Sequence, residues 1–169
     1  PAADVEGTDA LRKIAILAAL SYGKLIPMDM LTAKGITEVS LTDIEVAETF
    51  GCSVKLIGRA GKLEDGRIYA TVSPEFVKES CPMAHVNDVF NSILVRGNML
   101  GDAMFYGKGA GQLPTAGAVV ADVIDALETK YAAPARLFWE KAEATDIVPA
   151  DEVIATVAKE FCHIFEDGE

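Results

Sequence analysis

The chain has 169 residues and a formal net charge of −11. This acidity argues against nucleic acid or an anionic membrane surface as a partner, because both require a basic field on the protein. No apolar run approaches the roughly 20 residues of a membrane span, and no basic-then-apolar signal segment is present in the sequence. Three cysteines without CxxC spacing (Cys52, Cys81 and Cys162) predict free thiols in a cytoplasmic protein, and two histidines argue against a zinc site.

The first strong element is a helix predicted from Asp9 to about Tyr22. Thr8 is a suitable N-cap residue, and Gly23 is expected to end the helix. After Lys13 the apolar residues surround nearly the whole circumference. The pattern therefore predicts a helix that is buried on all sides.

The next elements are a short helix with a turn in residues 26–36 and a second full helix before Gly51. Ser40 or Thr42 is expected to cap this second helix, which runs to Phe50. Both precede the strand-rich middle of the chain, so we expect the helices to cover one face of a sheet.

Two hairpins are predicted in the middle of the chain. Residues 52–61 and 66–77 alternate between apolar and polar around a turn at 62–65, and residues 87–98 and 99–109 form a second pair that turns at Arg96–Asn98. The expected fold class is α/β, of an α+β-like kind. It has a mainly antiparallel, mixed sheet covered on one face by helices, plus C-terminal helices.

The last third of the chain is predicted to be helical. Residues 113–130 form a clear helix pattern with Pro114 near the first position, where proline is favoured. Residues 135–142 and 149–161 are amphipathic and are expected to be helices in an acidic tail.

One pair of side chains suggests chemistry. Asp9 and Lys13 are spaced i, i+4 and share a helix face with the apolar Ile16 and Leu20, so the pair is expected to extend a buried stripe. Asp4 precedes the helix and is close enough to reach the same place. The pair is either an ordinary helix-end ion pair or an active-site lysine held by an acid, and structural ion pairs are the commoner case.

A glycine-rich turn at residues 107–111 joins the last predicted strand to a helix. Glycines let the backbone approach a ligand closely, and the helix start offers free N–H groups. The turn lacks the GxGxxG spacing of a dinucleotide site, and no acidic residue ends a second strand about twenty residues later. A ligand-contacting loop and a plain strand-to-helix turn remain equally good interpretations.

Cys81 and His85 are a third, weaker candidate. A cysteine beside a histidine can serve as a nucleophile with its base. No third group in the sequence orients this pair, and the residues lie in a predicted loop between strands. A structural loop is therefore the favoured interpretation.

Two segments together resemble the homoserine dehydrogenases. Residues 4–23 (DVEGTDALRKIAILAALSYG) resemble the start of that family's catalytic domain, where an Asp–Gly–x–Asp–x–x–x–Lys pattern leads into a hydrophobic helix. Residues 105–124 (FYGKGAGQLPTAGAVVADVI) resemble the family's Gly-Ala-Gly loop with the following Pro-Thr-Ala helix. The resemblance covers about residues 1–131.

The resemblance implies an enzyme that interconverts L-homoserine and L-aspartate 4-semialdehyde with NAD or NADP, in threonine and methionine biosynthesis. By the family's pattern Lys13 is the proton donor, and Asp9 and Asp4 bind the substrate. A second set of residues, Gly109, Ala110 and Gly111, is implied to line the cofactor near its reactive end. A homodimer is also implied.

The resemblance further implies that a nucleotide-binding domain and a substrate-binding glutamate precede Pro1. We therefore expect residues 1–112 to be the substrate-binding, catalytic and dimerisation domain, inactive alone. Residues 113–131 are expected to pack toward the nucleotide-binding domain, and residues 132–169 to form an acidic helical tail or a linker to a regulatory ACT domain. The rival hypotheses are a non-catalytic dimerisation or ligand-sensing module and another two-domain NAD(P)-dependent dehydrogenase.

Overall fold

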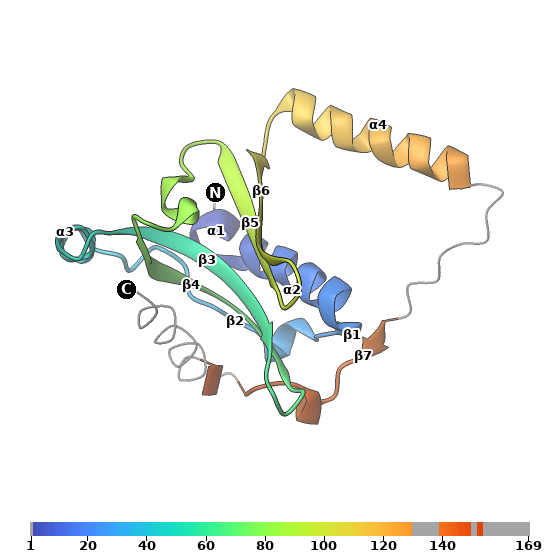
Figure 1. The fold of residues 1–169 in the computed structure, drawn as a ribbon, viewed down its shortest axis with the longest axis horizontal. Coiled ribbons are helices and arrows are strands. Elements are labelled where there is room, and N and C mark those ends of the chain that lie inside the picture. Colours follow the sequence, from blue (N-terminus) through green and yellow to red (C-terminus); the bar gives the residue numbers. More distant parts are fainter. Residues whose placement is uncertain (1, 130–138, 150–151, 154–169) are drawn as a thin grey trace. The chain divides into compact units, whose positions relative to one another are not determined.

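The computed structural model describes residues 2–129, 139–149 and 152–153 (Figure 1). Its contacts divide the chain into two compact units. Unit 1 comprises residues 1–47 and 54–76 with the tail from residue 138, and unit 2 comprises residues 48–53 and 77–137. Each unit is described by itself below. The class is mixed α/β, as predicted.

The chain of unit 1 begins with a single helical turn, α1 (Ala2–Val5), followed by the long helix α2 (Thr8–Tyr22). Gly23 ends α2 in the left-handed conformation, with φ at 72°, and its N–H donates to the carbonyl of Ala19, which confirms the predicted stop. The predicted N-cap is wrong. Gly7 occupies that position, and the hydroxyl of Thr8 instead donates to the carbonyl of Ala3, 3.3 Å away.

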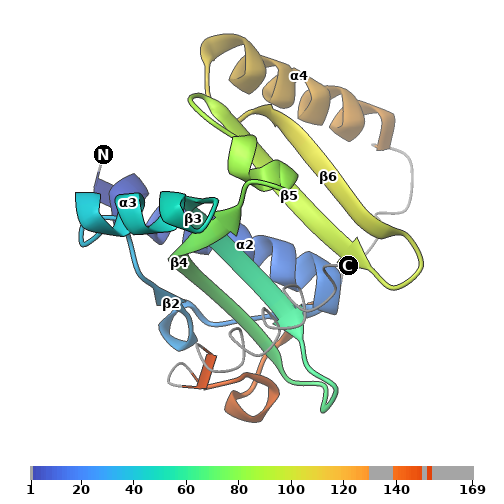
Figure 2. The same cartoon turned by 60° about the vertical axis from the view of Figure 1, so that its left-hand side comes forward.

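Helix α2 packs one face on a three-stranded sheet of order β2-β4-β3, and Figure 2 shows it behind the two long strands. The strands are β2 (Thr32–Ala33), β3 (Cys52–Lys62) and β4 (Ile68–Lys78). The shared core consists of small or branched apolar side chains from the helix and the sheet, which are Leu11, Ala15, Ala18, Ile68, Ala70 and Val72. Burying this apolar surface is what holds the helix on the sheet.

The remaining elements before the middle strands are short. The 3-10 helix η1 (Met28–Met30) forms where a short helix was predicted. The second predicted helix is α3 (Leu41–Thr49), and Ser40 caps it, because its hydroxyl accepts the N–H of Asp43 while the Asp43 carboxylate accepts from Ser40.

Unit 2 contains the second hairpin, formed by β5 (Phe90–Gly97) and β6 (Gly101–Lys108), after the 3-10 helix η2 (Pro82–His85). The strands are antiparallel, with Ile93 opposite Phe105. The turn, at residues 98–100, lies two residues later than predicted, since Arg96 is still in β5 and its guanidinium pairs with Asp102 across the strands at 2.7 Å.

The sheet of the first hairpin contains a strand that was not predicted. Strand β4 uses one edge for β3 and gives the other to β2, with Thr32 opposite Thr71 in a parallel register. A two-residue strand shows no alternation, so the sequence pattern could not reveal β2.

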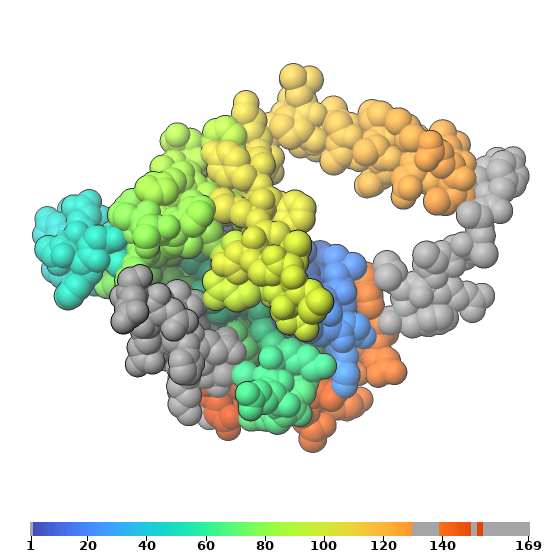
Figure 3. Space-filling view, in the orientation of Figure 1, coloured from blue at the N-terminus to red at the C-terminus, as the bar shows by residue number. Residues whose placement is uncertain are grey.

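Helix α4 (Gln112–Glu128) follows the second hairpin and nearly matches its prediction. Pro114 lies in the first turn, where a missing N–H costs no helical hydrogen bond. None of the side chains of α4 is buried, and Figure 3 shows the helix in yellow and orange with its surface in view.

The tail differs from its first predicted helix at residues 139–142, whereas Glu152 and Val153 of the second predicted helix are helical. Residues 139–142 include the strand β7 (Glu140–Lys141), which runs parallel to β1 (Lys24–Leu25), and the 3-10 helix η4 (Ala144–Asp146) follows. The N–H groups of Glu140 and Ala142 donate to the carbonyls of Gly23 and Leu25. Tertiary pairing therefore overrides the helix propensity of this segment. The other residues of the predicted tail helices, apart from Pro149, Glu152 and Val153, lie outside the described residues.

Candidate functional site

The predicted Asp–Lys site begins at the turn between α1 and α2, where the backbone is tightly packed. Gly7 has φ at 77°, and a Cβ atom added there would lie 3.1 Å from a methyl group of Val72. The carbonyl of Gly7 accepts the first helical hydrogen bond, from the N–H of Leu11 at 2.9 Å. Glycine is therefore favoured both by the left-handed conformation and by the close contact with β4.

Asp9 and Lys13 form the predicted ion pair on the first turns of α2. The Lys13 Nζ atom lies 2.7 Å from an Asp9 carboxylate oxygen. The side chains are 67% and 41% exposed for Lys13 and Asp9, respectively. The pair thus presents a positive and a negative group at an open surface.

The expected burial of this face is wrong. Ile16 and Leu20, which continue the face beyond Lys13, are more than half exposed. The buried face of α2 is the one with Leu11, Ala15 and Ala18, because only that side meets the sheet. The prediction that α2 is buried on all sides failed because apolar residues around a helix do not ensure that other elements pack against every side of it.

Asp4 lies in α1, directly before the turn that leads into α2. The backbone ties the two helices together, since the N–H of Gly7 donates to the carbonyl of Asp4 at 3.2 Å. The structure therefore brings Asp4, Asp9 and Lys13 to one region of unit 1. Together they offer one cation and two carboxylates, which are the charges that a small zwitterion requires.

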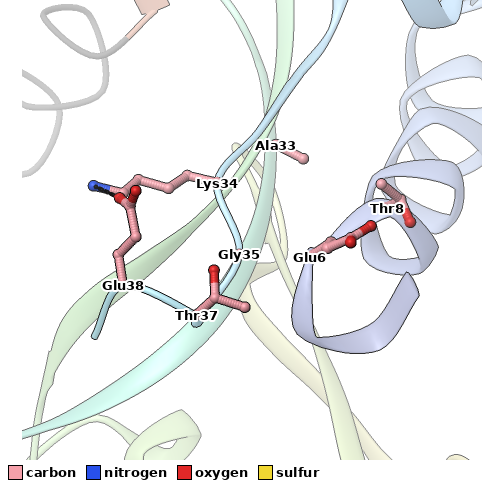
Figure 4. A pocket seen from close by; sticks show the side chains of 7 residues that line it. All are labelled: Glu6, Thr8, Ala33, Lys34, Gly35, Thr37 and Glu38. Carbon is pink, nitrogen blue, oxygen red and sulfur yellow. Dashed lines mark ion pairs between the residues drawn. The ribbon is translucent and has the colours of Figure 1, made fainter. Parts of the chain in front are cut away.

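An open hollow of about 370 Å³ lies beside the same turn (Figure 4). Glu6 and Thr8 come from the turn and α2, while Lys34 and Glu38, whose charged groups are 3.4 Å apart, come from the segment after β2. Its other lining residues are Ala33, Gly35 and Thr37. Sequence reasoning missed this hollow because residues 33–38 carry no recognisable motif and reach the turn only through β2.

The glycine-rich loop is in unit 2, between β6 and α4. Gly111 is the N-cap of α4 with φ at 131°, a conformation that favours glycine, and its carbonyl accepts from the N–H of Thr115. Gly109 donates its N–H to the carbonyl of Val89, and a Cβ atom there would overlap the side-chain amide of Asn91. The segment before α4 thus has only small side chains, at Gly109, Ala110 and Gly111. The first turn of α4 contains no acidic residue.

Cys81 and His85 do not form the nucleophile–base pair that was considered. The imidazole of His85 faces Glu79, with Nε2 2.9 Å from the carbonyl oxygen and Nδ1 3.6 Å from the carboxylate. Cys81 is partly buried and free, Cys52 is buried and free, and Cys162 lies outside the described residues. The favoured interpretation of a structural loop thus agrees with the observed contacts.

The described residues contain neither a metal-binding cluster nor a membrane-spanning helix. No cluster of three or more His, Cys, Asp or Glu side chains there is arranged to hold a metal ion. None of the helices in those same ranges has the length and apolar character needed to cross a bilayer.

Comparison with known proteins places the chain. A family model described as homoserine dehydrogenase matches residues 1–124. The homoserine dehydrogenase of Lactococcus lactis subsp. lactis is 37% identical over 155 residues, which are 91% of this chain and 36% of that protein. The crystal structure of a homoserine dehydrogenase from Thiobacillus denitrificans is 30% identical over 94% of this chain and 42% of its own, with a TM-score of 0.80.

A hyperthermophilic archaeal homoserine dehydrogenase, solved in complex with NADPH, is 28% identical over 76% of this chain and 35% of its own, with a TM-score of 0.61. The chain spans 36%, 30% and 37% of the length of three curated relatives. The matches cover both the Asp9–Lys13 segment and the glycine-rich loop. The chain belongs to the homoserine dehydrogenase family.

Proposed function

We propose that this chain is the substrate-binding and catalytic part of an enzyme that interconverts L-homoserine and L-aspartate 4-semialdehyde with NAD or NADP. The observation that carries the proposal is the Asp9–Lys13 pair, which lies at an exposed helix start within a family match. In threonine and methionine biosynthesis such an enzyme works in the cytoplasm, which fits an acidic chain whose described cysteines are free.

Lys13 is the proposed acid–base group. Reduction of the aldehyde develops negative charge on the carbonyl oxygen, and a positioned ammonium group stabilises this charge and donates the proton. In the reverse direction the neutral amine accepts the proton of the homoserine hydroxyl. The open position of Lys13 on α2 leaves its Nζ atom accessible to a substrate.

Asp9 and Asp4 are the proposed substrate-binding carboxylates. Asp9 holds the lysine ammonium at 2.7 Å, which limits the conformations of a long side chain. A carboxylate near the turn also suits the α-ammonium group of homoserine or aspartate 4-semialdehyde, because opposite charges attract at close range. The two acids therefore orient both the proton donor and the amino acid.

The nicotinamide cofactor would meet residues 109–111. The glycine conformation at Gly111 and the exposed start of α4 fit a flat ligand that approaches the backbone, as the loop presents no large side chain. When bound, the cofactor supplies or accepts the hydride. The role of Gly109, Ala110 and Gly111 is to give it room and peptide dipoles.

Two further partners belong to the proposal. The apolar side chains of α4, including Val120, Val123 and Leu127, are more than half exposed, which supports packing against a nucleotide-binding domain of the parent protein. Ile93 and Phe105, opposite each other on one face of the second hairpin, are exposed too and support a homodimer contact. The proposed domain limits are 1–112, 113–131 and 132–169.

The proposal is tested by Lys13→Ala and Lys13→Arg in the full-length parent protein. Loss of the proton donor should lower kcat by a factor of about 10² to 10⁴ with L-homoserine as the substrate. Arginine should not rescue turnover, because guanidinium stays protonated and has another shape. Asp9→Asn should raise the KM for homoserine as well as lower kcat.

The rival hypothesis of a non-catalytic module makes the opposite prediction. There the pair is an exposed helix-end contact, and Lys13→Ala would leave turnover near wild type with a slightly lower melting temperature. Product identification by mass spectrometry separates homoserine dehydrogenase from a dehydrogenase acting on another aspartate-derived carbonyl. Near-normal kcat in Lys13→Ala would end the catalytic assignment.

A further inference from the structure

Gly35 lies just after β2, against the turn that precedes the proposed site. A Cβ atom added to Gly35 would overlap the carbonyl oxygen of Val5 and lie 2.6 Å from the Cα atom of Glu6. Both atoms belong to the backbone, so no side-chain rotation could relieve the overlap. The chain segment after β2 can therefore approach the α1–α2 turn this closely only if residue 35 has no side chain.

Two backbone hydrogen bonds hold this approach from either side of Gly35. The N–H of Ile36 donates to the carbonyl of Val5 at 2.8 Å, and the N–H of Lys34 donates to the carbonyl of Val72 in β4 at 2.7 Å. Residues 34–36 thus connect the turn to the central strand of the sheet. The turn is fixed to the same sheet on which α2 packs.

We infer that Gly35 is a positioning residue, which keeps Asp4 at its place relative to Asp9 and Lys13. Asp4 is directly before Val5, and Asp9 and Lys13 are on the helix that starts after Gly7. A displacement of Val5 and Glu6 moves α1 while α2 stays on its core. The kinetic consequence of this inference rests on the proposed function, since it assigns substrate binding to Asp4.

The test uses Gly35→Ala in the full-length parent protein, with steady-state kinetics for homoserine and for the cofactor measured separately. A misplacement of about 1 Å at a binding group can cost roughly a hundredfold in rate. We expect the KM for homoserine to rise about tenfold or more while the KM for the cofactor stays within about twofold, because the cofactor meets other residues. A merely structural role would not separate the two KM values.

Gly61→Ala is the matched control. A Cβ atom there would lie 2.5 Å from the ring of Tyr69, so this variant also forces a repacking of unit 1. That contact involves a buried side chain that packs with Val148 and Val153, in a core cluster separate from the one that holds α2. Its melting temperature should fall, but its KM for homoserine, measured below that temperature, should stay near wild type.

Ile36→Pro is the second variant, in case Gly35→Ala does not fold. Proline removes the N–H that donates to Val5, and its Cδ atom takes the place of that hydrogen, so the ring faces the same Val5 carbonyl. It should raise the KM for homoserine in the same direction. An unchanged KM in the folded variants, or an equal rise in Gly61→Ala, would overturn the inference.

Failure of the proposed function gives a different result. If the wild-type parent protein does not oxidise homoserine, the proposed function fails, and crystal structures then decide the positioning role. A change of about 1 Å or more in the distance between the Asp4 carboxylate and Lys13 Nζ in Gly35→Ala or Ile36→Pro would support it. An unchanged distance would refute it.

Discussion

The start of α2 and the start of α4 both follow a glycine with positive φ, but they differ in what surrounds them. Gly7 packs against Val72 and lies beside a backbone segment hydrogen-bonded to the sheet, so α2 is held by its own unit. A Cβ atom added to Gly111 would meet the ring of Pro114 in its own helix, at 3.4 Å, and α4 buries no side chain. The start of α2 is held by contacts within its own unit, whereas α4 presents an exposed apolar surface, which is typical of a helix that binds a partner.

The largest expected effect concerns catalysis by residues 1–169 alone. Hydride transfer requires the nicotinamide to be held against the substrate, and the exposed α4 offers only one wall for it. The isolated chain should therefore show homoserine oxidation at least about 10³-fold below that of the full-length parent protein. Turnover close to that of the parent in an NAD(P)H absorbance assay would show that α4 needs no further domain to hold the cofactor, and would contradict the difference described between the two helix starts.

Hydrogen exchange should show the same contrast in stability. In the isolated chain, amides of α2 near Ala15 and Ala18 should exchange only through global unfolding, because both residues are buried against the sheet. Amides of α4 near Val120 should exchange orders of magnitude faster, because local opening exposes little additional apolar surface. In the full-length parent protein, amide exchange in α4 should be slower than in the isolated chain, while exchange in α2 should change little. Equal protection of both helices in the isolated chain would contradict this expectation.

Two glycines at opposite ends of α2 give a sharper comparison. Gly7 and Gly23 have φ values of 77° and 72°, so alanine costs left-handed strain of about 1–2 kcal/mol at either position. Only at Gly7 would the new methyl group also contact Val72, at 3.1 Å; nothing lies within 4 Å of it at Gly23. Urea denaturation should therefore show a larger loss of unfolding free energy for Gly7→Ala. Equal losses would mean that the strand contact relaxes freely.

Asp146, in the 3-10 helix η4, is expected to make a pH-dependent contribution to the free energy of unfolding. Hydrogen bonds from Lys24 and then from the Glu143 backbone lower the pKa of Asp146 below its ordinary value of 3.8. A lowered folded-state pKa means that the contribution to stability is present above about pH 4 and is lost as the pH falls through the folded pKa. Asp146→Asn should thus be less stable than wild type at pH 7, with the difference shrinking below pH 4. A difference that grows in acid would have the wrong sign.

The smallest expected effect is on stability at the proposed site itself. Exposed i, i+4 pairs contribute about 0.3–0.5 kcal/mol, so Asp9→Asn should change the unfolding free energy by no more than this. The same variant should change the kinetics strongly if the proposal is right. A loss of stability above 1 kcal/mol in thermal or urea unfolding would instead favour a mainly structural ion pair.

The sequence by itself determined the local elements and the chemistry of the first candidate site. The Gly23 stop, the two hairpins and the i, i+4 spacing of Asp9 and Lys13 depend on residues close in the chain, so pattern and propensity were sufficient. The family resemblance was confirmed by the comparisons because both of its motifs are local as well.

Tertiary structure decided what depends on distant neighbours. Strand β2 took the edge of β4, β7 paired with β1 in place of a helix, and one side of α2 stayed open beside Ile16. The part played by Gly35 depends on the backbone of Val5, thirty positions earlier, and no local pattern encodes such an approach. The hydrogen-bond partners of these segments, and the residues that pack over their side chains, come from elsewhere in the chain, and only the folded structure shows them.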